Sequence, residues 1–120
     1  MSRILIVDDD KTTVQLLQLL LQLEGFETQA VGRGSDVLNA VERFQPHLLL
    51  MDYHLADMDS IIVLRQLRQL EPYRKLPIVI ASGLDVEREV IQAGANRFLV
   101  KPFEPNELSK LFKVLIAEVN

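Results

Sequence analysis

Carboxylates directly follow two apolar segments of the chain. The segment Arg3–Val7 leads into the triplet Asp8–Asp10, and the segment Leu48–Met51 leads into Asp52. If both segments are neighbouring strands of a parallel sheet, these carboxylates meet at the carboxyl edge of that sheet. Crowded carboxylates raise one another's pKa unless a cation lies among them. Because the candidate ligands are all oxygens, the sequence predicts a hard cation, and Mg²⁺ with some retained waters fits best.

A hydroxyl and an ammonium follow two further apolar segments. Ser82 comes directly after Ile78–Ala81, and Gly83 beside it leaves room for a phosphoryl group to approach. Lys101 comes directly after Phe98–Val100. Its compact positive charge suits a carboxylate at rest and a phosphoryl oxygen after transfer.

Together these groups supply the parts that phosphoryl transfer requires. A loose phosphoryl transition state needs an in-line nucleophile, cations that stabilise its equatorial oxygens, and a hydrogen-bond donor. Asp52 is the predicted nucleophile, and Asp8 with Asp9 would hold the metal. Lys101 supplies a second cation, and the Ser82 hydroxyl supplies the donor.

Short apolar segments alternate with longer segments of helical spacing, which is typical of βαβ units. The predicted strands are Arg3–Val7, Glu27–Val31, Leu48–Met51, Ile78–Ala81 and Phe98–Val100. The predicted helices are Lys11–Leu23, Ser35–Phe44, Asp59–Leu70, Asp85–Ala93 and Pro105–Val119. Only Glu27–Val31 alternates between polar and apolar residues, so it suits an edge of the sheet. The pattern predicts one doubly wound α/β domain over residues 1–120.

Helix boundaries are marked by residues with known end preferences. Gly25 and Gly94 are placed for positive φ angles after helices. Asp10, Ser35, Asp59 and Asp85 are predicted to cap helix starts, and Pro105 suits a first helical turn. Asp57 is interpreted as a turn residue.

Composition limits the classes of protein that this chain fits. Its 120 residues are 48% hydrophobic, which is enough for one substantial core. The formal net charge of −4 disfavours sequence-independent binding to the phosphates of nucleic acids. The absence of cysteine excludes disulfides. The leucine-rich segment Val14–Leu23 is shorter than the roughly 20 apolar residues of a membrane span. With no signal peptide pattern in the sequence, we expect a cytoplasmic location.

In this order and spacing, the motifs resemble those of the receiver domains of two-component response regulators over essentially the whole chain. The similarity lies in Ile-Val-Asp8-Asp9-Asp10, Leu-Leu-Met-Asp52, Ser82-Gly83 and Lys101-Pro102-Phe103. It implies a flavodoxin-like (βα)5 fold with the strand order 2-1-3-4-5. It also implies that Asp52 accepts a phosphoryl group from a sensor histidine kinase or a histidine phosphotransfer protein. The domain would then catalyse only its own phosphorylation and dephosphorylation.

The resemblance also implies a metal site. Asp8, Asp9, Asp52 and the backbone carbonyl of His54 would hold Mg²⁺ or Mn²⁺. The Lys101-Pro102 peptide would be cis.

A switch is the third implication of the resemblance. Phe98 would turn inward when Ser82 moves toward the phosphoryl group, altering the surface of the fourth helix, fifth strand and fifth helix. That surface would act on an effector domain or protein that the sequence does not identify, and phosphorylation could also drive homodimer formation. Neither direct nucleic acid binding nor membrane contact is expected.

The chain departs from the family pattern near the expected site. Ala56 and Ser60 stand where the family usually has a proline and a glycine, and Gly83 stands where alanine is common. His54 and Leu84 occupy the positions where the family tunes access of water to the acyl phosphate.

A haloacid-dehalogenase-like phosphatase is a competing interpretation, because Asp8-Asp9-Asp10-Lys11-Thr12 also fits an Asp-x-Asp-x-Thr motif. Asp8 would then be the nucleophile and Asp10 the general acid/base. That interpretation lacks a further carboxylate pair after Lys101 and leaves Asp52 without a role.

Two more functions are compatible with the same architecture. A flavin binder would offer hydroxyls and backbone donors after the first strand, where this chain offers three carboxylates. A receiver-like docking module that is never phosphorylated would not need Asp52, Ser82 and Lys101 together.

Overall fold

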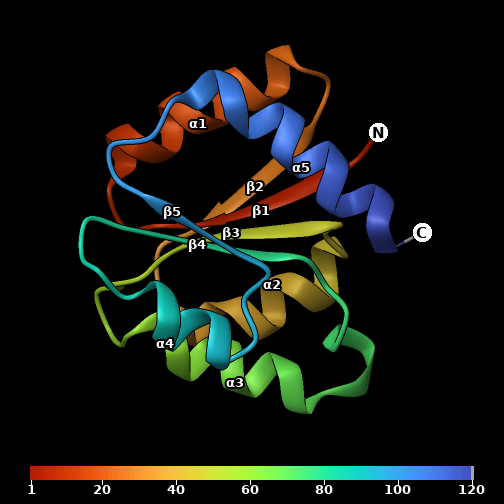
Figure 1. Cartoon of the computed structure of the whole chain (residues 1–120). Helices are drawn as coiled ribbons and strands as arrows, with labels where there is room; N and C mark the ends of the chain where they lie inside the picture. The colour runs from red at the N-terminus through yellow and green to blue at the C-terminus, as the bar shows by residue number, and fades with distance from the viewer. Residues whose placement is uncertain (120) are drawn as a thin grey trace.

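The computed structural model describes residues 1–119 as five parallel strands with helices on both faces (Figure 1). The strands are β1 (Arg3–Val7), β2 (Glu27–Val31), β3 (Leu48–Asp52), β4 (Ile78–Ser82) and β5 (Arg97–Val100). The α-helices are α1 (Lys11–Leu23), α2 (Val37–Phe44), α3 (Ser60–Gln69), α4 (Glu87–Gln92) and α5 (Pro105–Val119). Two short 3-10 helices, η1 (Gly34–Asp36) and η2 (Glu71–Tyr73), lie in the connections. The strand order β2-β1-β3-β4-β5 confirms the predicted fold class, with β2 at an edge.

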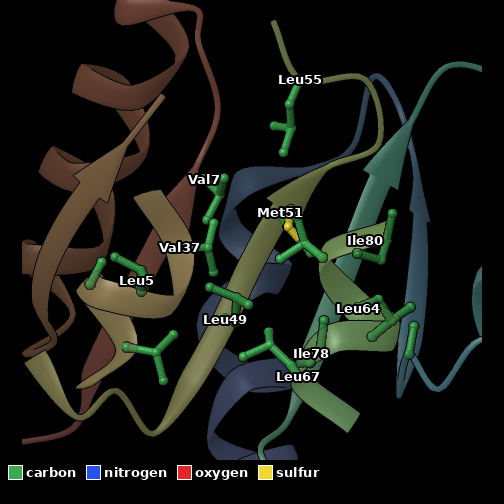
Figure 2. Close-up of a cluster of buried hydrophobic side chains, with 14 of the residues drawn as sticks. Leu5, Val7, Val37, Leu49, Met51, Leu55, Leu64, Leu67, Ile78 and Ile80 are labelled. Atoms are coloured by element: carbon green, nitrogen blue, oxygen red, sulfur yellow. The ribbon is translucent and has the colours of Figure 1, made fainter. Parts of the chain in front are cut away.

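Each face of the sheet has its own hydrophobic core. Helices α1 and α5 cover one face, and α2, α3 and α4 cover the other (Figure 1). Successive residues of a strand point to opposite faces, so Leu49 and Met51 of β3 pack toward α2 and α3 while Leu48 and Leu50 pack toward α1 and α5. Figure 2 shows the first of these clusters, with β1, β3 and β4 contributing side chains.

This two-sided burial fixes the register of the central strands. Sliding a strand by one residue would send each side chain to the opposite core, whose packing it does not fit. In the observed register Val7 of β1 lies opposite Met51 of β3, so Asp8, which follows β1, emerges at the level of Asp52. Asp52 itself forms the last residue of β3 and pairs with Ala81 of β4.

Several predicted helix ends are confirmed. The Asp10 carboxylate caps α1, accepting hydrogen bonds from Thr12 N at 3.1 Å and Thr13 Oγ1 at 2.8 Å. Gly25 and Gly94 have φ angles of 92° and 116°, which only glycine adopts without strain. The cis peptide expected before Pro102 is present.

Three helix starts differ from the prediction, that of α3 by a single residue, since α3 begins at Ser60. The segment predicted to be helical from Ser35 begins as η1, and α2 starts only at Val37 with Asp36 at its N-cap position. The Ser35 N–H is held by the Asp57 carboxylate, which fixes the backbone in a 3-10 turn. Helix α4 starts at Glu87 with Val86 at its N-cap position, so Asp85 does not cap it.

The late start of α4 has a local cause. The N–H of Val86 binds the Leu84 carbonyl at 3.0 Å, which closes a tight turn before the helix. Asp59 does lie at the N-cap position of α3, but its carboxylate pairs with the ring of His54 in place of the helix backbone.

Candidate functional site

Three carboxylates converge at the carboxyl ends of β1 and β3. One oxygen each from Asp8, Asp9 and Asp52 lies within 4.8 Å of the others. Asp8 is buried, Asp52 is partly buried, and Asp9 is exposed. The cluster follows from the β1–β3 register, because Asp8 continues β1 beyond Val7 at the level where Asp52 ends β3.

Lys101 lies against this cluster from the loop that follows β5. Its Nζ donates a hydrogen bond to Asp52 Oδ1 at 2.8 Å and lies 3.7 Å from Asp8 Oδ2. Burial by itself would lower the pKa of Lys101, but the hydrogen bond and negative charge of Asp52, with a contribution from Asp8, raise the pKa overall. Lys101 is therefore firmly protonated and neutralises part of the acidic cluster.

The environment of Asp8 opposes its ionisation. Burial raises the pKa of Asp8, and the negative charges of Asp52 and Asp9 raise it further. A hydrogen bond from the backbone N–H of Asp10 at 2.9 Å and the charge of Lys101 offset only part of this effect. An ionised carboxylate buried at this position is stabilised by a neighbouring positive charge.

Ser82 ends β4 beside the cluster. Its side chain is buried, and its Oγ accepts a hydrogen bond from Leu84 N at 3.0 Å. A backbone hydrogen bond links Ser82 to Lys101, because the Lys101 N–H donates to the Ser82 carbonyl at 2.9 Å. The hydroxyl proton is therefore available to a further acceptor on the same edge of the sheet.

His54 lies in the loop after β3. Its Nδ1 is 2.9 Å from Asp59 Oδ1, and both side chains are more than half exposed. The ring is thus turned toward α3, and the metal-binding role of the His54 carbonyl stays a prediction.

Phe98 lies in the middle of β5 and is half-buried. It packs against the core on the α2, α3 and α4 side of the sheet. Its strand partner is Ile80 of β4, two residues before Ser82. The proposed switching motion of Phe98 stays a prediction.

The donor set fits a small hard cation. Mg²⁺ prefers carboxylate and water oxygens, and it usually keeps several waters in place of a complete protein cage. The three carboxylates supply only oxygen, and Lys101 alone leaves them a net negative charge. Asp8, Asp9 and Asp52 are the side chains that would hold the ion, which would supply positive charge for neutralising phosphoryl oxygens.

Sequence reasoning misses one contact at the rim of the site. The two carboxylate oxygens of Asp57 accept hydrogen bonds from Gly34 N at 2.8 Å and Ser35 N at 3.0 Å. The sequence indicates only a turn residue at Asp57, because no local pattern points to partners 22 and 23 positions away.

The sequence profile of the response regulator receiver domain matches residues 4–113. The chain belongs to this receiver domain family. Among its relatives, the DNA-binding response regulator MtrA of Mycolicibacterium smegmatis is 38% identical over 110 residues, covering 89% of this chain and 47% of MtrA. The transcriptional regulatory protein PhoP of Bacillus subtilis is 32% identical over 118 residues, covering 96% of this chain and 48% of PhoP. The receiver domain thus spans about half the length of these relatives.

Solved receiver domains share the fold. A putative response regulator from Chloroflexus aurantiacus superposes with a TM-score of 0.91 and 32% identity over 97% of this chain and 98% of that one. The receiver domain of the sensor histidine kinase PA1611 from Pseudomonas aeruginosa gives a TM-score of 0.87 and 29% identity over 97% and 98% of the two chains. That structure has a magnesium ion coordinated in its active site cleft.

Family membership favours the receiver interpretation over a phosphatase or a flavin binder. The chain is a receiver domain of the kind found in two-component response regulators, and such domains interact with histidine kinases. Among the helices of residues 1–119, none combines the length and hydropathy of a bilayer span.

Proposed function

We propose that Asp52 accepts a phosphoryl group from a phosphohistidine of a sensor histidine kinase or a histidine phosphotransfer protein. Asp8, Asp9, Asp52 and the His54 carbonyl would hold Mg²⁺ or Mn²⁺ for this reaction. The observation that carries the proposal is the position of Lys101 Nζ, 2.8 Å from Asp52 and 3.7 Å from Asp8. Lys101 thus places a positive charge beside the nucleophile Asp52, where it can stabilise the negative charge of an incoming phosphoryl group.

The chemical step exchanges one bond to phosphorus for another. A carboxylate oxygen of Asp52 forms a bond to phosphorus, and the bond from phosphorus to the histidine nitrogen breaks. The electron pair of the broken bond stays with the imidazole, whose other ring nitrogen carries a proton, so that it leaves as the neutral base. The product is an acyl phosphate on Asp52.

The residues around Asp52 stabilise the transferred group. Lys101 holds the Asp52 carboxylate in place before transfer, and its ammonium then pairs with a phosphoryl oxygen. Ser82 donates a hydrogen bond from its hydroxyl to another phosphoryl oxygen, and its Oγ loses the hydrogen bond that it accepts from Leu84 N. This movement frees the start of the loop that leads to α4, and Phe98 turns inward to change the α4, β5 and α5 surface.

The domain is proposed to act as a switch that catalyses only its own phosphorylation and dephosphorylation. Its output would be an effector domain or protein recognised by that surface, with homodimer formation as another outcome of phosphorylation. MtrA is named as a DNA-binding response regulator. Because its net charge is −4, we expect the receiver domain itself not to bind nucleic acid directly. We also expect a cytoplasmic location.

Labelling with a small phosphodonor tests the proposal. The wild-type domain, incubated with acetyl phosphate and Mg²⁺, should acquire a covalent phosphoryl group, and Asp52→Asn should not. Asp36→Asn is the matched control, because it removes the same charge from an exposed position on η1. Persistent labelling of Asp52→Asn would count against Asp52, and an unlabelled wild type would favour a docking module.

A further inference from the structure

The loop between β3 and α3 is closed on itself. Leu55 N donates to the Met58 carbonyl at 3.0 Å, and His54 and Asp59 form an antiparallel bridge. Asp57 lies at the tip of this closed loop. The loop also carries His54, whose carbonyl is a proposed metal ligand, so its position matters for the acidic cluster.

Asp57 joins this loop to the one between β2 and α2. Its carboxylate spans the N–H groups of Gly34 and Ser35, the first two residues of η1. At the N-cap position of η1 stands Arg33, whose side chain makes no capping hydrogen bond. Asp57 therefore supplies the cap from a distant part of the chain, through hydrogen bonds to two backbone N–H groups.

Close packing surrounds these hydrogen bonds. A Cβ atom added to Gly34 would lie 2.7 Å from Cγ and Sδ of Met58 and 3.0 Å from Cγ2 of Val63, so the backbone of η1 rests directly on the β3–α3 loop. On its other side, the β2–α2 loop reaches Asp9, because a Cβ added to Gly32 would lie 3.6 Å from Asp9 Cα. The β2–α2 loop thus touches both loops that carry proposed metal ligands.

We propose that Asp57 is a positioning residue for the metal site. By clamping the β3–α3 loop onto η1, it fixes the backbone of His54 relative to Asp9. Ala56 does not restrict its own φ angle as a proline would. The two hydrogen bonds of Asp57, called the Asp57 clamp below, therefore restrict the loop in its place. This inference rests on the proposed function, since it concerns the Mg²⁺ site that phosphorylation uses.

The prediction concerns Mg²⁺ affinity, measured without any phosphodonor. Asp57→Asn keeps one acceptor oxygen but places an amide N–H₂ against the second backbone donor, so the Asp57 clamp is lost. Residues that orient metal ligands typically contribute about 10-fold or more to affinity, so we expect Mg²⁺ to bind Asp57→Asn about 10-fold more weakly. Gly34→Ala should weaken binding in the same direction, because its methyl group displaces Met58 while the carboxylate remains.

The experiment is a Mg²⁺ titration followed by backbone amide NMR shifts, with urea unfolding and amide exchange of Gly34 and Ser35 measured on the same samples. Asp36→Asn removes an equal charge from η1 but leaves the hydrogen bonds of Asp57 intact, so it measures the loss of Mg²⁺ affinity that is due to charge alone. The proposal is supported if Asp57→Asn and Gly34→Ala both lose far more affinity than Asp36→Asn and the Gly34 and Ser35 amides of Asp57→Asn exchange faster.

Equal Mg²⁺ affinities for Asp57→Asn and Asp36→Asn would overturn the inference and leave the proposed function standing. A wild-type domain that binds no Mg²⁺ would overturn the proposed function as well, so the two failures are distinct. If Asp57→Asn does not fold, the Mg²⁺ affinities of Gly34→Ala and Asp36→Asn are compared instead, and equal values would overturn the inference.

Discussion

Lys101 donates a 2.8 Å hydrogen bond to Asp52 although the two residues belong to the ends of strands that are not neighbours. Lys101 comes after β5 and Asp52 ends β3, with β4 between them. The ammonium therefore reaches across the end of β4, where Ser82 lies. This places a cation, a nucleophile and a hydroxyl on one edge of the sheet before any phosphoryl group arrives.

Removing the ammonium tests its share in the transfer. Lys101→Met keeps most of the apolar stem but deletes the charge that faces Asp52 and Asp8. Because loss of a preorganised charge or donor typically slows such reactions about 100-fold, labelling by acetyl phosphate should slow by about that factor. Lys110→Met, on α5, is the control for a general loss of positive charge. A labelling rate equal to that of the control would contradict the role given to Lys101.

Mg²⁺ should stabilise the fold through the acidic cluster. At a concentration 100 times its Kd, an ion that binds only the folded state adds about 2.7 kcal/mol to the free energy of unfolding. Asp9→Asn should lose most of this gain, while in EDTA it should be neutral or slightly stabilising because it relieves repulsion with Asp8. Thermal unfolding with Mg²⁺ and with EDTA measures both effects. A variant stabilised by Mg²⁺ as strongly as the wild type would show that Asp9 is not a ligand.

The strands are the easiest elements to predict, because buried parallel strands leave continuous apolar segments. β1 and β2 match their predicted bounds, and β3 and β4 each extend one residue further, into Asp52 and Ser82. Those two residues are polar, so hydropathy alone ends the predicted strands too early. The convergence of Asp8 and Asp52 is also predictable, since it depends only on β1 and β3 being parallel neighbours.

Contacts between distant loops are not predictable in the same way. The hydrogen bonds of Asp57 with Gly34 and Ser35 depend on how two connections fold over the sheet, and they delay the start of α2. Local propensity does not encode these contacts. The late start of α4 differs in origin, because a local turn closed by Val86 N and the Leu84 carbonyl precedes the helix where Asp85 was predicted to cap it.

The contribution of Asp57 to stability should depend on pH. Hydrogen bonds from Gly34 N and Ser35 N hold the pKa of Asp57 below its usual 3.8 in the folded chain. A carboxyl group with a lowered folded pKa stabilises the fold above its unfolded pKa, and this stability is lost as the pH falls through the folded pKa. The difference in urea midpoint between wild type and Asp57→Asn should therefore be largest above pH 3.8 and shrink below it. A difference that grows on acidification would contradict this account.

Ser82 should couple phosphorylation to the output surface. Ser82→Ala leaves Leu84 N without its side-chain acceptor, which costs about 1 kcal/mol, and it removes the donor proposed for the phosphoryl group. Labelling should persist at a reduced level, because Asp52 and Lys101 remain. The NMR shift change of the Phe98 ring on phosphorylation should be lost. A Phe98 response as large as in the wild type would separate Ser82 from the switch.

The identity of the phosphorylated aspartate decides whether Asp52 is the nucleophile. After phosphorylation by acetyl phosphate with Mg²⁺, borohydride reduction of the acyl phosphate followed by peptide mass spectrometry identifies the modified aspartate. The modification should lie on Asp52 and leave Asp8 intact. Modification of Asp8 with an intact Asp52 would contradict the assignment of Asp52 as nucleophile and favour the phosphatase interpretation.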